Sequence, residues 1–252
     1  MIYLGPITGD KLRQNKARQD KVCSDWQAYY QQQAAQARHP LLQQFYSAGM
    51  VAADTAISDV PLVAIDFETT GLDPARNSIV SIGLVPFNLQ RVFSSRARQW
   101  LVKPRLQLTD ESVTVHGITH SEVDNAPDLS RILPEFLSLL AGKVAVVHYR
   151  QIEREFMIAA VQARLGEAIM FPVIDTLDLE ARLHRVRPLS WWDKLRRRQP
   201  ESVRLDASRK RYGLPSYRPH HAVTDAIASA ELLQAQIHHR FSMDTPVREL
   251  WG

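Results

Sequence analysis

The sequence predicts an α/β protein in which helices flank a mixed five-stranded sheet, preceded by a helical extension at the N-terminus. Three observations predict this class. Short polar connections separate three successive apolar runs within residues 61–104, which is typical of an antiparallel meander. Further along the chain, apolar runs alternate with helical periodicity, which favours parallel strands covered by helices. Residues 1–60 are rich in Gln, Ala and aromatic residues and have no strand-like alternation.

In chain order, the extension is expected to hold a helix from Lys16 to Arg38, a break at Pro40 and a short helix from Leu41 to Ala48. The expected strands are PLVAIDFE, SIVSIGLVPFN, ARQWLVKP, KVAVVHY and FPVIDTL, at 61–68, 78–88, 97–104, 143–149 and 171–177. Helical patterns follow at 128–140, 152–165, 178–184, 202–212 and 222–239.

These patterns divide the chain into three parts. They are a helical extension (1–60), a main domain (61–240) with a basic insertion at about 182–212, and a C-terminal tail (241–252). The sequence leaves open whether the extension packs against the main domain or binds a protein partner.

Composition excludes several classes of protein. Of the 252 residues, 45% are hydrophobic and 23% are charged, as in globular proteins with a buried core. Cys23 is the only thiol, which excludes an internal disulfide and suits a reducing compartment. No apolar run approaches the ~18 residues of a membrane span, and the N-terminal charges precede no apolar signal segment. We therefore expect a cytoplasmic protein without membrane contact.

Positive charge is concentrated in one window. The formal net charge is +4, but residues 182–212 hold 11 basic and three acidic residues, a local charge of +8. Basic residues interleaved with tryptophan suit a polyphosphate ligand with stackable bases, although a solvated, arginine-rich loop explains the charge equally well. The residues expected to contact nucleic acid are Trp191, Trp192, Arg196, Arg197 and Arg198.

Two groups of residues are candidates for chemistry. Asp66 and Glu68 share one side of the first strand, because alternate residues of a strand point to the same face. Paired carboxylates repel each other when buried, and a divalent cation such as Mg²⁺ or Mn²⁺ relieves that repulsion. Asp225 opens the last helix, and His220 precedes it by five residues and could take a proton from water. Solvated acids, a helix-capping Asp225 and a surface His220 are the structural alternatives.

Several motifs together resemble a known family. DFETTGLDP, SIVSIG, VTVHGIT, FPVIDTL and PHHAVTDA follow one another between residues 66 and 226. Their order and spacing are similar to those of DnaQ-like 3′–5′ exonucleases of the DEDDh branch, which includes proofreading subunits of bacterial replicative polymerases. The resemblance covers about residues 60–238 and implies an RNase H-like fold.

The resemblance also implies roles for individual residues. Asp66, Glu68 and Asp225 match metal ligands, and His220 matches the general base. The segment after KVAVVHY places Glu153 where the family has the fourth acid, an aspartate, while Phe156 keeps the family register. The extra methylene of Glu153 puts metal spacing and rate in question. Residues expected at the terminal nucleotide are Phe67, Thr69, Thr70, Gly71 and Leu72, with Leu72 as a wedge against the base.

The activity implied is a two-metal hydrolysis. Four acids would hold two Mg²⁺ or Mn²⁺ ions, and a water deprotonated by His220 would attack the last phosphodiester and release a 5′-mononucleotide. The expected substrates are 3′ ends of single-stranded DNA or RNA; DNA is favoured, but the sequence leaves the choice between them open. A polymerase or another protein could bind through residues 1–60. Two alternatives stay open: a nucleic-acid-binding adaptor with a degenerate site at Glu153, and a hydrolase of short RNA or other oligonucleotides.

Overall fold

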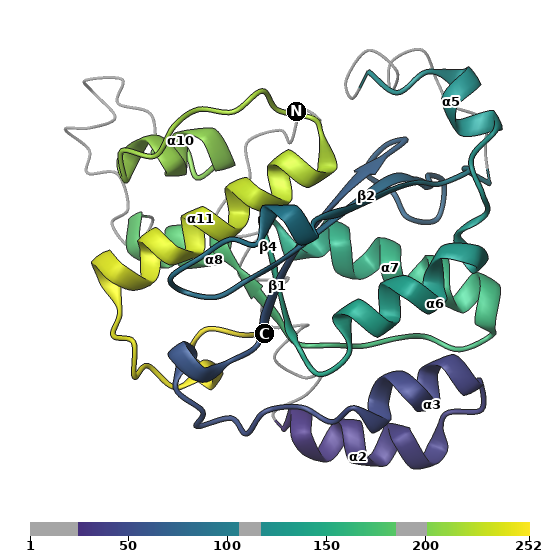
Figure 1. Ribbon diagram of the computed structural model, residues 1–252, viewed down its shortest axis with the longest axis horizontal. Helices are drawn as coiled ribbons and strands as arrows, with labels where there is room; N and C mark the ends of the chain where they lie inside the picture. The colour runs from purple at the N-terminus through teal and green to yellow at the C-terminus, as the bar shows by residue number, and fades with distance from the viewer. Residues whose placement is uncertain (1–24, 106–116, 185–200) are drawn as a thin grey trace, which may run out of the picture.

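The centre of the molecule is a five-stranded sheet with the strand order β3-β2-β1-β4-β5 (Figure 1). The structure is a computed structural model that describes residues 25–105, 117–184 and 201–252. The strands are β1 (Leu62–Thr69), β2 (Ile79–Phe87), β3 (Arg98–Leu101), β4 (Val144–Val147) and β5 (Val173–Asp175). Four of them lie within the apolar runs identified in the sequence, and β1 extends one residue beyond its run, so the prediction of a mixed five-stranded sheet is confirmed.

The sheet has an antiparallel half and a parallel half. β1, β2 and β3 form the predicted meander, in which β2 runs antiparallel to both neighbours. β4 pairs parallel to β1, and β5 pairs parallel to β4. The carboxyl ends of β1, β4 and β5 therefore meet at one edge of the sheet. The regular pairing of β1 is interrupted at this edge by an irregularity between Glu68 and Thr69.

Helices of very different length surround the sheet. They are α2 (Trp26–Gln36), α3 (Pro40–Ser47), α5 (His120–Asp124), α6 (Leu129–Leu140), α7 (Arg150–Leu165), α8 (Thr176–His184), α10 (Leu205–Arg211) and α11 (Ala222–Arg240). α5 is absent from the elements predicted by apolar periodicity, because one turn is too short to show a period. It is stabilised by a capping box between Thr119 and Glu122. None of the helices described has both the length and the apolar character needed to cross a bilayer.

Different helices cover the two faces of the sheet (Figure 1). Phe67 of β1 packs against Phe136 of α6, with ring centroids 6.4 Å apart. Gly83 of β2 is the register partner of Asp66 and lies under Ala222, the first residue of α11. Because successive strand residues point to opposite faces, Asp66 faces α11 while Phe67 faces α6.

The two N-terminal helices pack into the hydrophobic core. Tyr30 of α2 is fully buried and meets Tyr46 of α3 edge to face, with ring centroids 5.1 Å apart. The connection between the helices is fixed by Glu167, which accepts hydrogen bonds from the backbone nitrogens of Arg38 and His39. Pro40 is the first residue of α3 rather than a break before it, since proline suits the first turn of a helix. The start of the predicted first helix lies outside the described residues.

The last residues of the chain cover the β5 edge of the sheet. Trp251 bridges Ile174, and the backbone nitrogen of Gly252 donates to the carbonyl oxygen of Val173 at 3.0 Å. Arg154 of α7 donates to the carbonyl oxygen of Gly252. The C-terminal residues thus lie beside the helix that follows β4.

Candidate active site

The predicted acids Asp66 and Glu68 lie at the carboxyl end of β1, on the face covered by α11. Glu68 is buried, with 6% of its surface exposed. Directly after it the register with β2 shifts, and Thr69 pairs with Ile79. Both carboxylates lie on the face of β1 that the start of α11 covers.

α11 supplies the second pair of candidate residues. The backbone nitrogen of His220 donates to Oδ2 of Asp225 at 2.9 Å, which fixes the loop to the first turn of α11. His220 has a φ of +70°, a left-handed conformation that residues other than glycine rarely adopt. One ligand atom each of Glu68, His220 and Asp225 lies within 4.8 Å of the others. Glu68 lies far from His220 and Asp225 in the sequence, and the fold brings the three residues together.

Gly83 allows α11 to approach the sheet closely enough for this convergence. A Cβ atom at position 83 would overlap the backbone of Ala222 and Val223. Because Gly83 pairs with Asp66, the absence of a side chain brings the start of α11 directly beside the first acid. The glycine of the SIVSIG motif therefore has a role that the sequence pattern alone does not reveal.

Glu153 reaches the same region from the first turn of α7. Its side chain is 3% exposed, and within the described part of the chain its Oε2 atom has no hydrogen-bond partner. The helix start is held by Asp175 at the end of β5, which accepts hydrogen bonds from the backbone nitrogens of Tyr149 and Arg150 at 2.9 and 3.1 Å. Asp175 also accepts from Leu177 and so stabilises the start of α8.

The carboxylates of four residues influence one another's pKa values, and we call these residues the acidic cluster: Asp66, Glu68, Glu153 and Asp225. Burial, and then the charges of Asp225, Glu68 and Glu153, raise the pKa of Asp66 well above its ordinary value. Burial and the neighbouring Asp225 raise the pKa of Glu68 to about 8. The pKa of Glu153 is also raised, first by burial and then by the nearby acids, and burial raises the pKa of Asp225 to about 6.

The residues present fit divalent cations. Without a cation, the cluster holds several carboxylates whose ionisation is opposed by burial and by one another. The buried Oε2 atom of Glu153 lacks a hydrogen-bond donor among the described residues, so this oxygen is available to bind a cation. Hard carboxylate oxygens are the ligands that Mg²⁺ and Mn²⁺ prefer. Asp66, Glu68, Glu153 and Asp225 are therefore the residues that would hold such ions.

The segment expected at the terminal nucleotide forms a tight turn after β1. Thr69 donates its hydroxyl to the carbonyl oxygen of Gly71 at 2.7 Å. Across the turn, the backbone nitrogen of Thr70 donates to the carbonyl oxygen of Ser78, and the Thr70 hydroxyl accepts from the backbone nitrogen of Ser78. Leu72 is 41% exposed, an unusual environment for leucine. The side chain of Phe67 packs into the core against α6, so only its backbone is available to a ligand on the Asp66 side.

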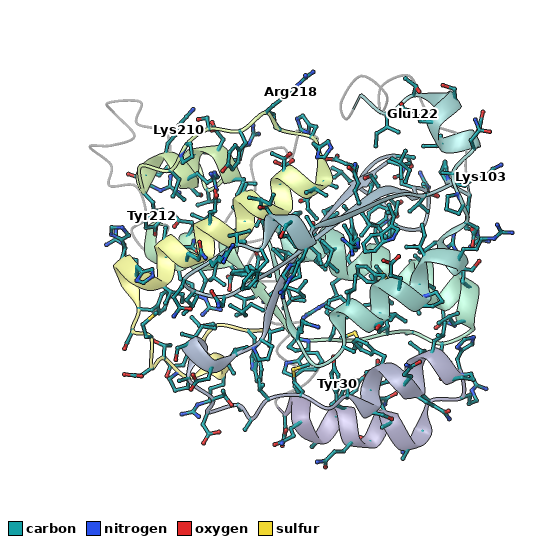
Figure 2. All side chains as sticks on the ribbon, viewed as in Figure 1. Tyr30, Lys103, Glu122, Lys210, Tyr212 and Arg218 are labelled. Atoms are coloured by element: carbon teal, nitrogen blue, oxygen red, sulfur yellow. The ribbon has the colours of Figure 1, made fainter. Side chains whose placement is uncertain are left out.

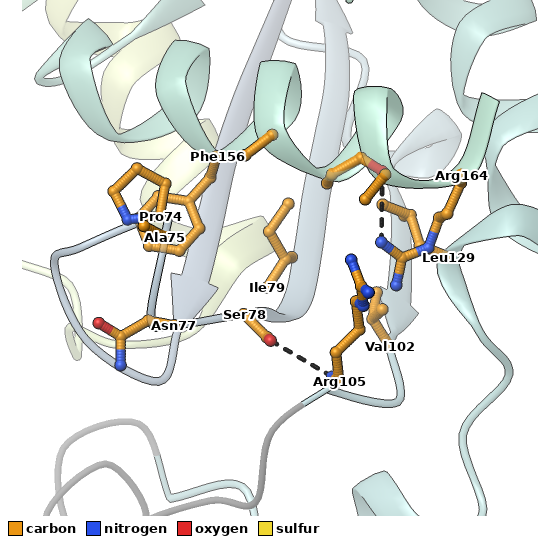
Figure 3. Close-up of a pocket in the computed structure, with 13 residues that line it drawn as sticks. Pro74, Ala75, Asn77, Ser78, Ile79, Val102, Arg105, Leu129, Phe156 and Arg164 are labelled. Atoms are coloured by element: carbon orange, nitrogen blue, oxygen red, sulfur yellow. Dashed lines mark hydrogen bonds between the residues drawn. The ribbon is translucent and has the colours of Figure 1, made fainter. Parts of the chain in front are cut away.

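A pocket of about 300 Å³ adjoins this turn (Figure 3). Pro74, Ala75 and Phe156 lie at one end, and Arg105 and Arg164 lie at the other. Phe156 follows Glu153 by one helical turn, but none of the described residues that line the pocket belongs to the acidic cluster. Alanine residues of α7 form much of its wall, and Arg164 is bound to Asp128 at 2.8 Å.

The basic window predicted at 182–212 is only partly described. Trp191, Trp192, Arg196, Arg197 and Arg198 lie outside the described residues, as does His116 of the VTVHGIT motif.

In residues 201–212 of this window, Arg209 and Arg211 form ion pairs with acids from other parts of the chain. This corrects the interpretation that only three acids oppose the positive charge of the window. Arg209 bonds Glu231 at 2.7 Å, and Arg211 bonds the fully buried Glu180 at 2.7 Å. Both acids lie outside the window, so local counting could not reveal them. His148 is likewise engaged internally: its Nδ1 lies 2.8 Å from Thr176 Oγ1 and its Nε2 lies 3.0 Å from the carbonyl oxygen of Val203.

Comparison with curated proteins finds relatives in bacterial DNA replication. The chain is 30% identical over 179 residues to a DNA polymerase III PolC-type of Thermotoga maritima, covering 71% of this chain and 12% of the relative. It is 30% identical over 182 residues to a DNA polymerase III subunit epsilon-like protein of Rhodobacter capsulatus, covering 71% of this chain and 24% of the relative. The chain therefore spans at most a quarter of the length of these relatives.

Solved structures share the fold. The nuclease domain of 3′hExo, a DEDDh family member bound to rAMP, superposes with a TM-score of 0.58 at 19% identity, over 71% of this chain and 92% of that domain. Exonuclease I of E. coli in its complex with single-stranded DNA gives a TM-score of 0.56 at 16% identity, over 72% and 41% of the two chains. These likenesses identify the mixed sheet with its flanking helices as the RNase H-like fold.

The chain also matches a family profile. The profile of the exonuclease family RNase_T covers residues 63–233, which include β1, the acidic cluster and most of α11. The matched range exceeds half of the chain and contains every acid of the cluster described above. The chain therefore belongs to the DnaQ-like exonuclease family.

Proposed function

We propose that this protein is a metal-dependent 3′–5′ exonuclease that releases 5′-mononucleotides from single-stranded nucleic acid, with DNA as the preferred substrate. The observation that carries the proposal is the convergence of ligand atoms from Glu68, His220 and Asp225 within 4.8 Å, beside the buried Glu153. Membership of the DnaQ-like family supports the 3′–5′ direction. The DNA polymerase III relatives support DNA as the substrate.

The four acids would hold two divalent cations. Bound there, such ions would supply Lewis acidity at the phosphodiester and would lower the pKa of a bound water. Asp66 and Glu68 present their oxygens from a strand, and Glu153 and Asp225 present theirs from the first turns of two helices. These elements are rigid, so the ligand positions are preorganised.

His220 is proposed as the general base. Its ligand nitrogen lies within 4.8 Å of carboxylate oxygens of Glu68 and Asp225, close enough to accept a proton from a water between them. The hydrogen bond from its backbone nitrogen to Asp225 fixes the residue relative to the acids. Leu72 and the backbone of the Thr70–Gly71 turn are proposed to position the terminal nucleotide.

The proposal is tested with a single strand labelled at its 5′ end, incubated with Mg²⁺ or Mn²⁺. A ladder of shortening labelled products together with free 5′-mononucleotides is expected on DNA, with slower hydrolysis of RNA. Asp66→Asn and Asp225→Asn should each lower the rate by more than about 100-fold, while the exposed Asp244→Asn serves as the matched control. Intact strands with every metal would refute the proposal.

The same assay separates the alternatives. An adaptor with a degenerate site would bind the strand and leave it intact. A hydrolase of short oligonucleotides would cleave dinucleotides faster than longer strands. The preserved burial of Glu153 beside Asp66 favours a working site over a degenerate one.

A protein partner such as a polymerase is proposed to contact the N-terminal extension. The aromatic side chains that face inward from α2 and α3 are used in the core. A partner would therefore contact the outer, glutamine-rich side of α2 or residues that precede Asp25. The domain boundaries at residues 60 and 240 stay predictions.

A further inference from the structure

The loop that leads to His220 carries two exposed side chains that the proposed mechanism does not use. Tyr217 is 37% exposed, and together with Leu72 it makes up the exposed large hydrophobic residues of the described ranges. Arg218 follows it, and Figure 2 shows the Arg218 side chain pointing away from the ribbon into solvent. Leu72 lies four residues after Glu68, and Tyr217 lies three residues before His220, so the two residues border the acidic cluster from different loops.

Tyr217 is held in a fixed orientation. Its ring lies over the guanidinium of Arg209, with 4.6 Å between Cζ and the ring centroid. Its hydroxyl donates to Oε1 of Glu231 at 3.0 Å. Arg209 covers one face of the Tyr217 ring, and Glu231 binds the Tyr217 hydroxyl. The exposed part of Tyr217 is therefore the other face of the ring and its edge.

The support beneath Tyr217 is itself rigid. Arg209 is almost fully buried and donates to Oε2 of Glu231 and to the carbonyl oxygen of Ala228, both at 2.7 Å. It also donates to the carbonyl oxygen of Pro215 at 2.9 Å, which anchors the loop two residues before Tyr217. A buried arginine thus prepares an outward-facing aromatic ring before any ligand arrives.

We propose that Tyr217 and Arg218 form a second subsite for nucleic acid, in which Tyr217 stacks on a base upstream of the scissile bond and Arg218 contacts a backbone phosphate. This inference rests on the proposed function, since it names how that substrate is held. An aromatic face stacks on any base, and an exposed arginine supplies the charge for phosphate without base preference. The ligand class is therefore single-stranded DNA or RNA with little sequence specificity.

The placement suits a strand whose 3′ end lies in the acidic cluster. Glu231, which holds the Tyr217 hydroxyl, lies six residues after Asp225 on α11, or about 9 Å along the helix axis. This spacing puts the ring beside the nucleotides next to the terminal one. Arg218 has no ion-pair partner among the described residues, so its charge is available to a phosphate.

The first test compares two substrates that differ only in the upstream strand. An oligodeoxynucleotide reaches the subsite, whereas the p-nitrophenyl ester of thymidine 5′-monophosphate contains a cleavable phosphodiester and no upstream nucleotide. Tyr217→Ala should lower the ratio of kcat/KM for the oligonucleotide to kcat/KM for the ester by about tenfold. Tyr217→Phe should restore most of that ratio. Phe93→Ala, which removes another aromatic ring stacked on arginine, is the matched control.

The second test measures binding in the presence of a chelator, so that no strand is hydrolysed. Fluorescence anisotropy of a labelled oligodeoxynucleotide should give a dissociation constant about tenfold higher for Tyr217→Ala. Arg218→Ala should reduce the slope of log affinity against log salt by about 0.7, the contribution of one phosphate contact on a single strand. Arg218→Lys should keep the slope, as should the control Arg248→Ala.

The outcomes separate this inference from the proposed function. An unchanged substrate ratio and an unchanged dissociation constant in Tyr217→Ala would overturn the subsite while exonuclease activity persists. An equal loss on both substrates would also overturn it, because the loop would then only position His220. Tight binding of the strand by the wild type, lost in Tyr217→Ala and accompanied by no hydrolysis, would support the subsite and refute the exonuclease.

Discussion

At the scale of single residues, Glu153 has the least ordinary environment in the acidic cluster. It stands where the family has aspartate, it is buried, and its Oε2 atom has no donor within the described ranges. The longer side chain is accommodated at the start of α7, whose position is fixed by Asp175 rather than by a local cap. Removing the Glu153 charge should therefore affect stability and activity in opposite directions.

We predict that Glu153→Gln raises the thermal midpoint of the metal-free protein at pH 8, because one of several repelling carboxylates is lost. The same change should lower exonuclease activity by more than about 100-fold, since a proposed metal ligand is removed. Glu153→Asp should keep measurable activity. Scanning fluorimetry in chelator and a strand-shortening assay measure the two effects. A lower midpoint for Glu153→Gln would contradict the proposed repulsion.

The raised pKa values predict a pH-dependent response to metal removal. Burial and Asp225 raise the pKa of Glu68 to about 8, and burial raises the pKa of Asp225 to about 6. The folded protein then holds protons that the unfolded chain releases near pH 4, so the stability of the chelated protein falls as pH rises to about 8. Cations replace these protons. Saturating Mn²⁺ should therefore raise the thermal midpoint more at pH 8 than at pH 6, and an equal rise at both pH values would count against the site.

At the scale of elements, the close approach of α11 to β2 brings the two halves of the site together. Gly83 pairs with Asp66 on the sheet and lies under Ala222, three residues before Asp225. A single missing side chain thus sets the separation between a strand that carries two acids and a helix that carries a third.

Gly83→Ala should displace the start of α11, because the new Cβ would overlap backbone atoms that have no side-chain freedom. We expect a loss of about 1–3 kcal/mol in the free energy of unfolding and a disproportionate loss of activity. Gly49→Ala is the control: its φ of +71° strains a side chain, and no other atom lies close to the new Cβ. Denaturant melts and rate assays compare the two variants. Equal activity in both would show that the contact at Gly83 is unimportant for the site.

At the scale of the whole molecule, the N-terminal helices extend the core of the nuclease fold. Tyr30, Phe45 and Tyr46 form a cluster of edge-to-face and tilted rings, and the hydroxyl of Tyr46 accepts a hydrogen bond from the backbone nitrogen of Met170. α3 also packs on α6. The described part of the extension therefore contributes to the stability of the fold, whatever else its outer face binds.

Phe45→Ala should lower the free energy of unfolding by about 3–5 kcal/mol, since it empties a fully buried ring position. The activity of the protein that remains folded should be little changed, because the site lies at the opposite edge of the sheet. Gln32→Ala, at an exposed position of α2, is the matched control. Chemical denaturation with a parallel activity assay measures both quantities. A Phe45→Ala protein as stable as the control would mean that the N-terminal helices α2 and α3 contribute little to the stability of the fold.

The sequence predicted what depends on local pattern and on family motifs. Strand alternation placed Asp66 and Glu68 on one face, and the structure brings Asp225 and His220 to Glu68. The sequence could not predict ion-pair partners that come from distant segments of the chain. Arg209 and Arg211 belong to the basic window, whose charge suits a polyphosphate ligand. Glu231 and Glu180 neutralise them, and both acids lie outside the window, so a count of charges along the window does not include them.

The local sequence patterns also could not predict contacts that a residue makes with the backbone of a distant segment. Asp175 at the end of β5 bonds Leu177 in the helix that follows it. It also fixes the start of α7, because parallel pairing of β4 with β5 brings two strand ends together. The role of Gly83 depends in the same way on a helix that begins 139 residues later.

The pairing of Trp251 and Gly252 with β5 has a practical consequence for handling the protein. Gly252 lies against Arg150 and Arg154, in the first turns of the helix that carries Glu153. Any polypeptide fused after Gly252, including a purification tag, must leave through this crowded spot and would press on that helix.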